Sequence, residues 1–516
     1  GEGGRWKGNA LLPNNAESSS HGFAGTDVAP ASLAQAYEAD SVDNGCHRAH
    51  SAPIHGLRED FDETVNLACS GAKNKHLWPL NEDGSEYRGE PQQLDQLEEL
   101  MLTNEVQLIV LGVGGNDMGF SSLIVECMVS YAINALNPIA NRHCRDEVDL
   151  RVGELFHVER KVKKTIELTR AKMASAGKLE GLDYKILLMG YPSVTADSTD
   201  VHMGNGDSHI NFYLQCPFDL GDLAYVDQTL IGPMNGMYAS IAKQMNVNFL
   251  SVKEAFNGHK LCDGRNYRGF DQPDEPMQAS TREWVRFLDI PYVTGIEDIA
   301  DRAVELELEE PVSGEQGRVQ ESMHPNYFGQ EAIGACLKQM WTRMGQESDS
   351  KSFECFMPRS VNYGDYSDLV VAEKQRNRTI NIPGTFVPPG SSQYLEFEVD
   401  FNEDDANRAL NSAFVEVMGS HYDDSDFTIS LVTPTGQIRS ILYRPAPGDG
   451  DNNSPNPGEG GLEPLSIGEP GLPYNGHSRT VYLLKEAYNN GVYRILLENN
   501  SPSFPLIIDN IDVTIL

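Results

Sequence analysis

Apolar and polar residues alternate along the first two-thirds of the chain in a pattern that predicts strands and helices in turn. Three apolar runs, 106–111, 184–189 and 247–252, are short enough to be buried strands. Helix-length amphipathic segments occur at about 154–176 and 224–245. A further helix is predicted after Pro325, where apolar residues recur at three- and four-residue spacing up to Met344. This alternation predicts an α/β fold between about residues 46 and 344.

The pattern changes after about Cys355, where helical periodicity gives way to short β-type runs separated by Pro, Gly, Asn and Asp. Such runs predict an antiparallel β-sandwich. We therefore expect a first domain at 1–345, a linker at 346–376 and a β-sandwich accessory domain at 377–516, with a long loop at 445–470. The predicted strands are 394–399, 413–417, 427–432, 438–443, 480–484, 492–497 and 506–515.

The composition excludes two classes of partner. The 516 residues include 40 Lys and Arg against 76 Asp and Glu, which gives a formal charge of −36. This charge argues against nucleic acid and against anionic membrane surfaces, because both need clustered basic residues. No apolar run approaches the roughly 20 residues of a membrane-spanning helix. The acidic balance favours an extracellular, saline setting in which self-repulsion is screened.

Eight cysteines all lie in the first region or at its end, and none forms a Cys-x-x-Cys pair. An even number without such pairs favours disulfides over zinc, and hence an oxidising compartment and secretion. Eight cysteines allow 105 connectivities. Pairing of sequence neighbours, 46–69, 127–144, 216–262 and 336–355, is the simplest of them. The alternative is a set of buried free thiols in a cytosolic enzyme.

Three segments carry candidate chemistry, and each has a plainer structural interpretation. The glycine-rich run 111–117 lies at the end of a predicted strand and contains Asn116, which is either an oxyanion donor or a helix cap. In 321–326, His324 precedes a predicted helix, and Glu321 stands three residues before it. His324 is either a general base whose imidazole Glu321 orients, or a surface histidine beside a helix-capping residue. Gly71, in 66–72, is either a second backbone donor or part of a simple turn.

Together and in this order, the three segments resemble the SGNH (GDSL-type) hydrolases, and specifically their secreted bacterial lipase and esterase branch. The segments 190–192 and 256–262 also resemble that branch, so the resemblance covers about residues 1–345. It implies a flavodoxin-like three-layer α/β/α domain that hydrolyses carboxylic esters of lipids or acylated sugars. In that mechanism a Ser attacks the acyl carbon, His324 is the base, and Gly71 and Asn116 donate to the oxyanion. Glu321, or a backbone carbonyl, would orient His324.

The family carries its nucleophile in a Gly-Asp-Ser block that is followed, in this branch, by a Gly-Glu-Gly-like segment. Because the chain opens with Gly1-Glu2-Gly3, we expect that block just upstream of Gly1. A literal Gly-Asp-Ser at 206–208 is rejected, since it follows Gly71 and Asn116 and no apolar strand leads into it. One alternative is a non-catalytic extracellular binding or structural protein on the same scaffold. A calcium-dependent surface adhesin is another.

The carboxy-terminal region resembles the jelly-roll modules appended to secreted hydrolases, such as the P-domain of proprotein convertases. The resemblance rests on the segments 426–436 and 491–495. It implies an accessory domain that binds a polysaccharide, a cell surface or a protein partner. We expect no cofactor for catalysis. Acidic loops at 402–407, 422–426 and 449–453 make structural calcium a candidate for this domain.

Overall fold

The computed structural model divides the chain into two compact units, residues 1–373 and 374–516. It describes Glu38, Ser41, 44–120, seven positions between 123 and 134, 143–195, 220–261, 284–285, 323–344, 352–358, 361, 364–374, 378–399 and the strands beyond. Within these residues, no helix has the length and apolar character needed to cross a membrane.

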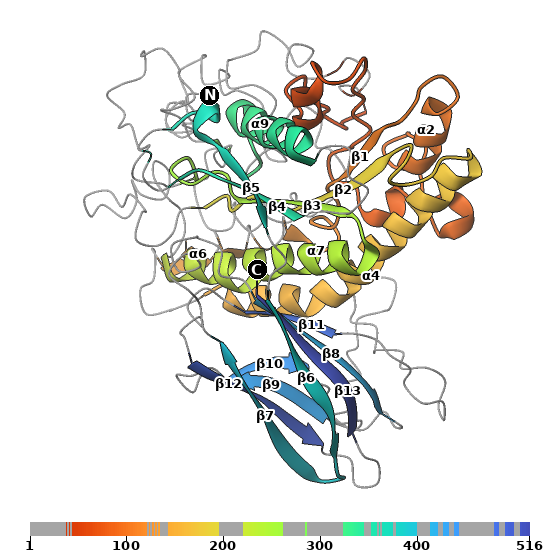
Figure 1. The fold of residues 1–516 in the computed structure, drawn as a ribbon. Coiled ribbons are helices and arrows are strands. Elements are labelled where there is room, and N and C mark those ends of the chain that lie inside the picture. The colour runs from red at the N-terminus through yellow and green to blue at the C-terminus, as the bar shows by residue number, and fades with distance from the viewer. Residues whose placement is uncertain are drawn as a thin grey trace. The chain divides into compact units, whose positions relative to one another are not determined.

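The first unit is built on a five-stranded sheet of order β1-β2-β3-β4-β5 (Figure 1). The pairings β1–β2, β2–β3 and β3–β4 are all parallel. Both faces of β2 are buried, which explains its unbroken apolar run Ile186-Leu187-Leu188. The strands are β1 (Leu108–Leu111), β2 (Lys185–Met189), β3 (Asn248–Glu254), β4 (Ser352–Phe356) and β5 (Val370–Lys374).

Helices cover the two faces of this sheet (Figure 1), with α4, α6 and α7 on one side and α9 on the other. The α/β prediction is confirmed at this level, and the first three strands lie where their apolar runs predict. The helix predicted at 224–245 is interrupted by a π-helical turn, Asp227–Ile231. The helices are α2 (Gln93–Leu100), α4 (Arg145–Ser175), α6 (Leu220–Val226), α7 (Gly232–Met245) and α9 (Tyr327–Met344), with short 3-10 turns at Pro53–Leu57, Asn74–His76, Leu80–Glu82 and Tyr366–Asp368.

Strands β4 and β5 lie within the 346–376 segment that the sequence pattern assigns to a linker. The disulfide Cys336–Cys355 ties β4 to helix α9, and Phe353 and Cys355 are fully buried. A strand this short carries too few residues for a clear periodic signal, and its position depends on the partner strand β3.

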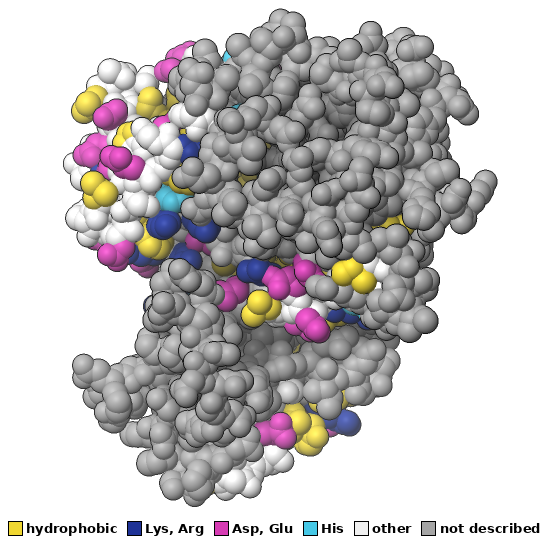
Figure 2. Space-filling model, turned by 180° about the vertical axis from the view of Figure 1, so that it is seen from behind, with side chains coloured by type: hydrophobic (Ala, Val, Ile, Leu, Met, Phe, Trp, Pro, Cys, Tyr) yellow, Lys and Arg dark blue, Asp and Glu magenta, His cyan; other side chains and the backbone are white. Residues whose placement is uncertain are grey.

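Three disulfides confirm the neighbour pairing of six cysteines: Cys46–Cys69, Cys127–Cys144 and Cys336–Cys355. Cys216 and Cys262 lie outside the described residues. On the face seen in Figure 2, acidic side chains of the described surface lie among Lys and Arg side chains. Local pairing of this kind reduces the repulsion that a formal charge of −36 implies.

The second unit contains two four-stranded antiparallel sheets, of order β10-β9-β12-β7 and β11-β8-β13-β6. All seven predicted runs are strands, and β6 is an eighth that the pattern does not predict. A hydrogen bond of 3.0 Å from Asn499 Nδ2 to Val387 O joins the two sheets beside buried Tyr493 and Ile495. The strands are β6 (Arg378–Val387), β7 (Ser391–Val399), β8 (Ala413–His421), β9 (Phe427–Val432), β10 (Ile438–Leu442), β11 (Arg479–Leu483), β12 (Gly491–Asn499) and β13 (Leu506–Ile515).

Candidate functional site

The structure brings together the two segments that contain Gly71 and Asn116. Asn116 follows β1 at the carboxyl edge of the parallel sheet, where ligands bind in folds of this kind. Its Nδ2 donates a hydrogen bond of 3.1 Å to the carbonyl oxygen of Ala72, the residue after Gly71. Within the described residues, neither the second Nδ2 proton nor the backbone N–H of Gly71 has a hydrogen-bond partner. Two donors are therefore available side by side.

The turn at Gly71 needs a glycine for two separate reasons. Its φ of +84° lies in the left-handed region that L side chains avoid. A Cβ at this position would also lie 2.5 Å from the Tyr87 hydroxyl oxygen. The two residues before Gly71 are held against Cys46 by the Cys46–Cys69 disulfide and by a 3.0 Å hydrogen bond from Ser70 N to Cys46 O.

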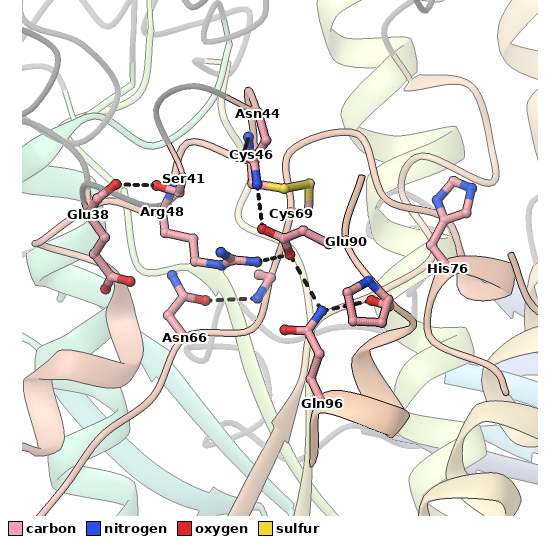
Figure 3. Close-up of a disulfide and its surroundings, with 12 residues drawn as sticks. Glu38, Ser41, Asn44, Cys46, Arg48, Asn66, Cys69, His76, Glu90 and Gln96 are labelled. Atoms are coloured by element: carbon pink, nitrogen blue, oxygen red, sulfur yellow. Dashed lines mark hydrogen bonds and ion pairs between the residues drawn. A yellow bond between two sulfur atoms is a disulfide. The ribbon is translucent and has the colours of Figure 1, made fainter. Parts of the chain in front are cut away.

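A carboxylate hub stands beside this disulfide (Figure 3), where Asn44, Arg48 and Gln96 all donate to Glu90. Burial alone would raise the pKa of Glu90, but the hydrogen bond and the charge of Arg48 hold that pKa below its usual value. The hub connects the start of the described chain to the hairpin that carries Glu90 and to helix α2. It thereby fixes the loops around Gly71 without touching Gly71 itself.

A second buried polar network holds the Asn116 segment. The Asp117 carboxylate, only 2% exposed, accepts hydrogen bonds of 2.9 Å from both the backbone and the side-chain nitrogen of Asn74, and it pairs with Lys161 at 3.2 Å. The Oδ1 atom of Asn74 in turn accepts from Thr165 Oγ1 at 2.6 Å, and Trp78 Nε1 donates to that same hydroxyl at 2.8 Å. Helix α4 thus anchors both loops of the site.

Two tyrosines support the glycine turn between β1 and Asn116. Gly114 has φ +121°, and a Cβ there would lie 2.5 Å from the hydroxyl oxygen of Tyr238, which donates to Val113 O at 2.6 Å. Gly115 N donates to the Tyr191 hydroxyl at 3.0 Å, and burial raises the pKa of Tyr191. Tyr191 belongs to the predicted 190–192 segment. Tyr238 carries no local sequence signal, since it lies in a helix that is buried without a break from Pro233 to Ala242.

His324 lies directly before helix α9, and its side chain is exposed. The helix is capped by Asn326, whose Oδ1 accepts from Gly329 N at 3.1 Å. Met323 has a left-handed φ of +65°, and its side chain is buried. Glu321 lies outside the described residues, so its role as the orienting carboxylate stays a prediction. Ser208 of the Gly-Asp-Ser at 206–208 also lies outside them, so its rejection as the nucleophile stays a prediction too.

A small cavity of about 20 Å³ is lined mainly by apolar side chains. Met323, the residue before His324, contributes one wall, and Phe120, four residues after Asn116, contributes another. The remaining walls include Leu123, Val194, Leu223 and Ile231. His324 and Asn116 are not among the described residues that line it. The volume holds about one water-sized group.

One carboxylate, Asp222, also lines this cavity and is 2% exposed. It accepts hydrogen bonds from His143 Nδ1 at 3.1 Å, from Cys144 N at 3.1 Å and from Arg145 Nε at 3.2 Å. The Cys127–Cys144 disulfide fixes the same wall. Asp222 therefore serves to hold the start of helix α4 against α6, and its charge is paired.

A buried ion cluster lies beneath the carboxyl edge of β2 and β3. Lys253 Nζ contacts Asp227 at 3.2 Å and Glu254 at 3.0 Å, and Ser193 Oγ donates to Asp227 at 2.5 Å. Burial opposes the charge of Lys253, but the two carboxylates raise its pKa above the usual value. Asp227 is the first residue of the π-helical turn that follows α6. Its contact with Lys253 of β3 therefore joins this turn to the sheet.

Within the described residues, no group of three or more His, Cys, Asp or Glu side chains is arranged to hold a metal ion. The acidic loops at 402–407, 422–426 and 449–453 lie outside those residues, so the calcium prediction stays a prediction.

Comparisons with known proteins find similarity only to solved structures, at low sequence identity. No protein-family model matches the chain, and neither does any curated protein. Among solved structures, the chain is similar to an extracellular lipase from Streptomyces rimosus (16% identity, 61% of this chain and 91% of that chain, TM-score 0.32). It is also similar to phospholipase A1 from Streptomyces albidoflavus NA297 (18% identity, 60% and 91%, TM-score 0.34). At identities and TM-scores this low, the roles proposed for individual residues rest on the geometry of the chain itself.

Proposed function

We propose that this protein is an extracellular serine ester hydrolase whose oxyanion site is formed by Gly71 and Asn116. The observation that carries the proposal is the pairing of two available donors, the Gly71 N–H and the second Asn116 amide proton, which the Asn116–Ala72 hydrogen bond holds together. Donors fixed before the reaction stabilise the negative charge of a tetrahedral intermediate without reorganisation. The networks through Asp117 and Glu90 supply the rigidity that this function requires.

In the proposed reaction, a serine hydroxyl attacks the acyl carbon of the ester. His324 accepts the serine proton and returns it to the leaving alcohol, and water then hydrolyses the acyl-enzyme with His324 again as the base. The exposed position of His324, next to a cavity wall formed by Met323, supports this role. The serine is not assigned to any described residue.

The small apolar cavity favours esters with a short acyl group. Its volume of about 20 Å³, between Phe120, Leu223 and Met323, holds about one water-sized group, so a methyl group fits and a longer hydrocarbon chain does not. We therefore expect kcat/KM to be at least as high for p-nitrophenyl acetate as for p-nitrophenyl hexanoate. A lipase with a long acyl pocket would show the opposite preference.

The test of the function is ester hydrolysis by the mature protein, including any residues that precede Gly1, with His324→Ala and Asn116→Ala as the variants. We expect His324→Ala to remove most of the rate and Asn116→Ala to lower kcat by about 100- to 1,000-fold. His50→Ala and Asn81→Ala, which change exposed residues of the same types, are the matched controls. A wild-type rate no faster than that of His324→Ala would refute the proposal and favour a non-catalytic binding protein.

The nucleophile is found in the same experiment. A fluorophosphonate probe reacts with an activated serine, and mass spectrometry of the digested adduct identifies the serine that carries it. Labelling that disappears in His324→Ala supports the mechanism. Labelling at Ser208 would instead contradict our rejection of the Gly-Asp-Ser at 206–208.

A further inference from the structure

Tyr87 faces the proposed oxyanion site from a different part of the chain. A Cβ on Gly71 would lie 2.5 Å from the hydroxyl oxygen of Tyr87 and 3.6 Å from the ring carbon that bears it. The hydroxyl, more than the ring, is therefore the part of Tyr87 that approaches Gly71. The side chain is half-buried, so its polar end lies at the boundary between the protein and the site.

The ring of Tyr87 is held firmly in this position. It stacks on His76, with ring centroids 4.2 Å apart and an interplanar angle of 10°, and the guanidinium of Arg88 lies 5.3 Å from its centroid. His76 is itself fixed, because its Nδ1 accepts from Lys73 N at 3.0 Å. Such a clamp leaves the phenol ring little freedom to turn its hydroxyl elsewhere.

The backbone beneath Tyr87 is equally constrained. Tyr87 and Glu90 exchange two backbone hydrogen bonds, of 3.1 and 2.9 Å, across a two-residue turn. The turn residues Arg88 and Gly89 both have positive φ, +53° and +76°, as tight hairpins of this type require. Glu90 is the carboxylate hub beside the disulfide, so the hairpin is anchored to the loop of Gly71 from two directions.

The Tyr87 hydroxyl has no hydrogen-bond partner among the residues that the structure describes. The hydroxyl is not among the buried groups that lack a partner, so it is open to solvent and can also reach a bound ligand. The clamped ring directs this donor toward Gly71, whose neighbour Ala72 accepts the hydrogen bond of Asn116. A negatively charged oxygen bound there would satisfy all three groups.

We propose that Tyr87 is a further catalytic residue, whose hydroxyl donates a hydrogen bond to the oxyanion of the tetrahedral intermediate. The inference rests on the proposed ester hydrolysis, since it needs a substrate acyl oxygen at Gly71 and Asn116. The proton stays on the phenol throughout, and only the strength of the hydrogen bond changes as charge develops on the oxygen. Such a donor acts on the transition state more than on the bound ester.

The test is Tyr87→Phe in the full chain, which removes the hydroxyl and keeps the stacked ring. We expect kcat for p-nitrophenyl acetate to fall about 10- to 100-fold, with KM changed less than about twofold. Inhibition by an alkyl trifluoromethyl ketone, which forms a tetrahedral adduct, is expected to weaken by a similar factor. The matched control is Tyr394→Phe, at an exposed tyrosine of the second unit, and it should behave as wild type.

The outcomes separate this inference from the proposed function. If Tyr87→Phe keeps the wild-type kcat and inhibitor affinity while His324→Ala is inactive, the role of Tyr87 is refuted and the ester hydrolase proposal stands. If the wild-type chain hydrolyses no ester, both are refuted. A loss of kcat with an unchanged urea midpoint supports the inference, because a merely structural role would lower stability as well.

Discussion

Thr165→Val is the perturbation that most directly tests how the site is held together. The change keeps the shape of the side chain and removes one hydroxyl, which lies in the middle of the network that reaches Asp117. Thr165 Oγ1 lies 2.6 Å from Asn74 Oδ1 and 3.0 Å from the helix carbonyl of Lys161. Since the hydroxyl has one proton and accepts from Trp78, the shorter contact identifies Asn74 as the acceptor.

Valine leaves two buried groups without their partner: the Trp78 Nε1–H and the Asn74 Oδ1. Asn74 is fully buried, and each orphaned group costs about 1–3 kcal/mol. We therefore expect the free energy of unfolding of the first unit to fall by about 2–5 kcal/mol. Because Asn74 also holds Asp117, the residue after Asn116, kcat for ester hydrolysis should fall as well.

The assay is urea unfolding followed by tryptophan fluorescence. All four tryptophans, at positions 6, 78, 284 and 341, belong to the first unit, so the signal reports its unfolding alone. The matched control is Thr169→Val, one turn further along α4. That threonine is also fully buried, but its hydroxyl donates only to the helix carbonyl of Thr165.

We expect Thr169→Val to cost no more than about 1 kcal/mol. Thr165→Ser, which restores the hydroxyl, should recover most of the stability. If Thr165→Val and Thr169→Val are equally stable, the hydrogen bonds of Thr165 do not contribute the expected free energy of unfolding. The rigidity of the Asn116 segment must then come from packing.

Two further predictions concern buried charge. Burial, with Arg88 nearby, lowers the pKa of His47 from 6.5 to about 4. As pH falls, His47 therefore takes up a proton in the unfolded chain before it does so in the folded chain. The free energy of unfolding should fall by about 1–3 kcal/mol as pH drops from 6.5 to 4. His47→Asn, which tolerates the φ of +50°, should flatten that slope in urea titrations, and an unchanged slope would contradict this source. Asp227→Asn leaves Lys253 with Glu254 as its remaining carboxylate partner and should cost about 3–5 kcal/mol in free energy of unfolding. Glu59→Gln, in an exposed pair, should change the free energy of unfolding far less, and equal losses would refute the distinction.

Much of the fold can be predicted from the chain because the relevant signals are local. The runs that become β2 and β3 are buried over most of their length, and such burial leaves a largely apolar pattern, while β1 is an apolar run that is half-buried. Strands β4 and β5 have no such signal. They are short, and they are strands because β3 provides an edge and Cys336–Cys355 holds β4 in place.

The candidate site divides in the same way. Gly71, Asn116 and His324 stand in recognisable local contexts, so their residue types and neighbours suffice to single them out. Tyr87, Asn74 and Thr165 stand in no such context. Their importance comes from partners 16, 43 and 91 residues away along the chain, and no periodicity or spacing encodes contacts at such separations.

The sequence by itself determined the alternation of strands and helices, the change to a β region and the residue types of the candidate chemistry, because propensity, periodicity and turn formation act over a few neighbouring residues. It also suggested the disulfide pairing, since all three described bridges close short loops. Only the tertiary structure decided that Asn116 meets the loop of Gly71, that Met323 and Phe120 share one cavity, and that the Tyr87 hydroxyl approaches Gly71. These contacts join segments that are far apart along the chain, and they form only when the whole domain folds.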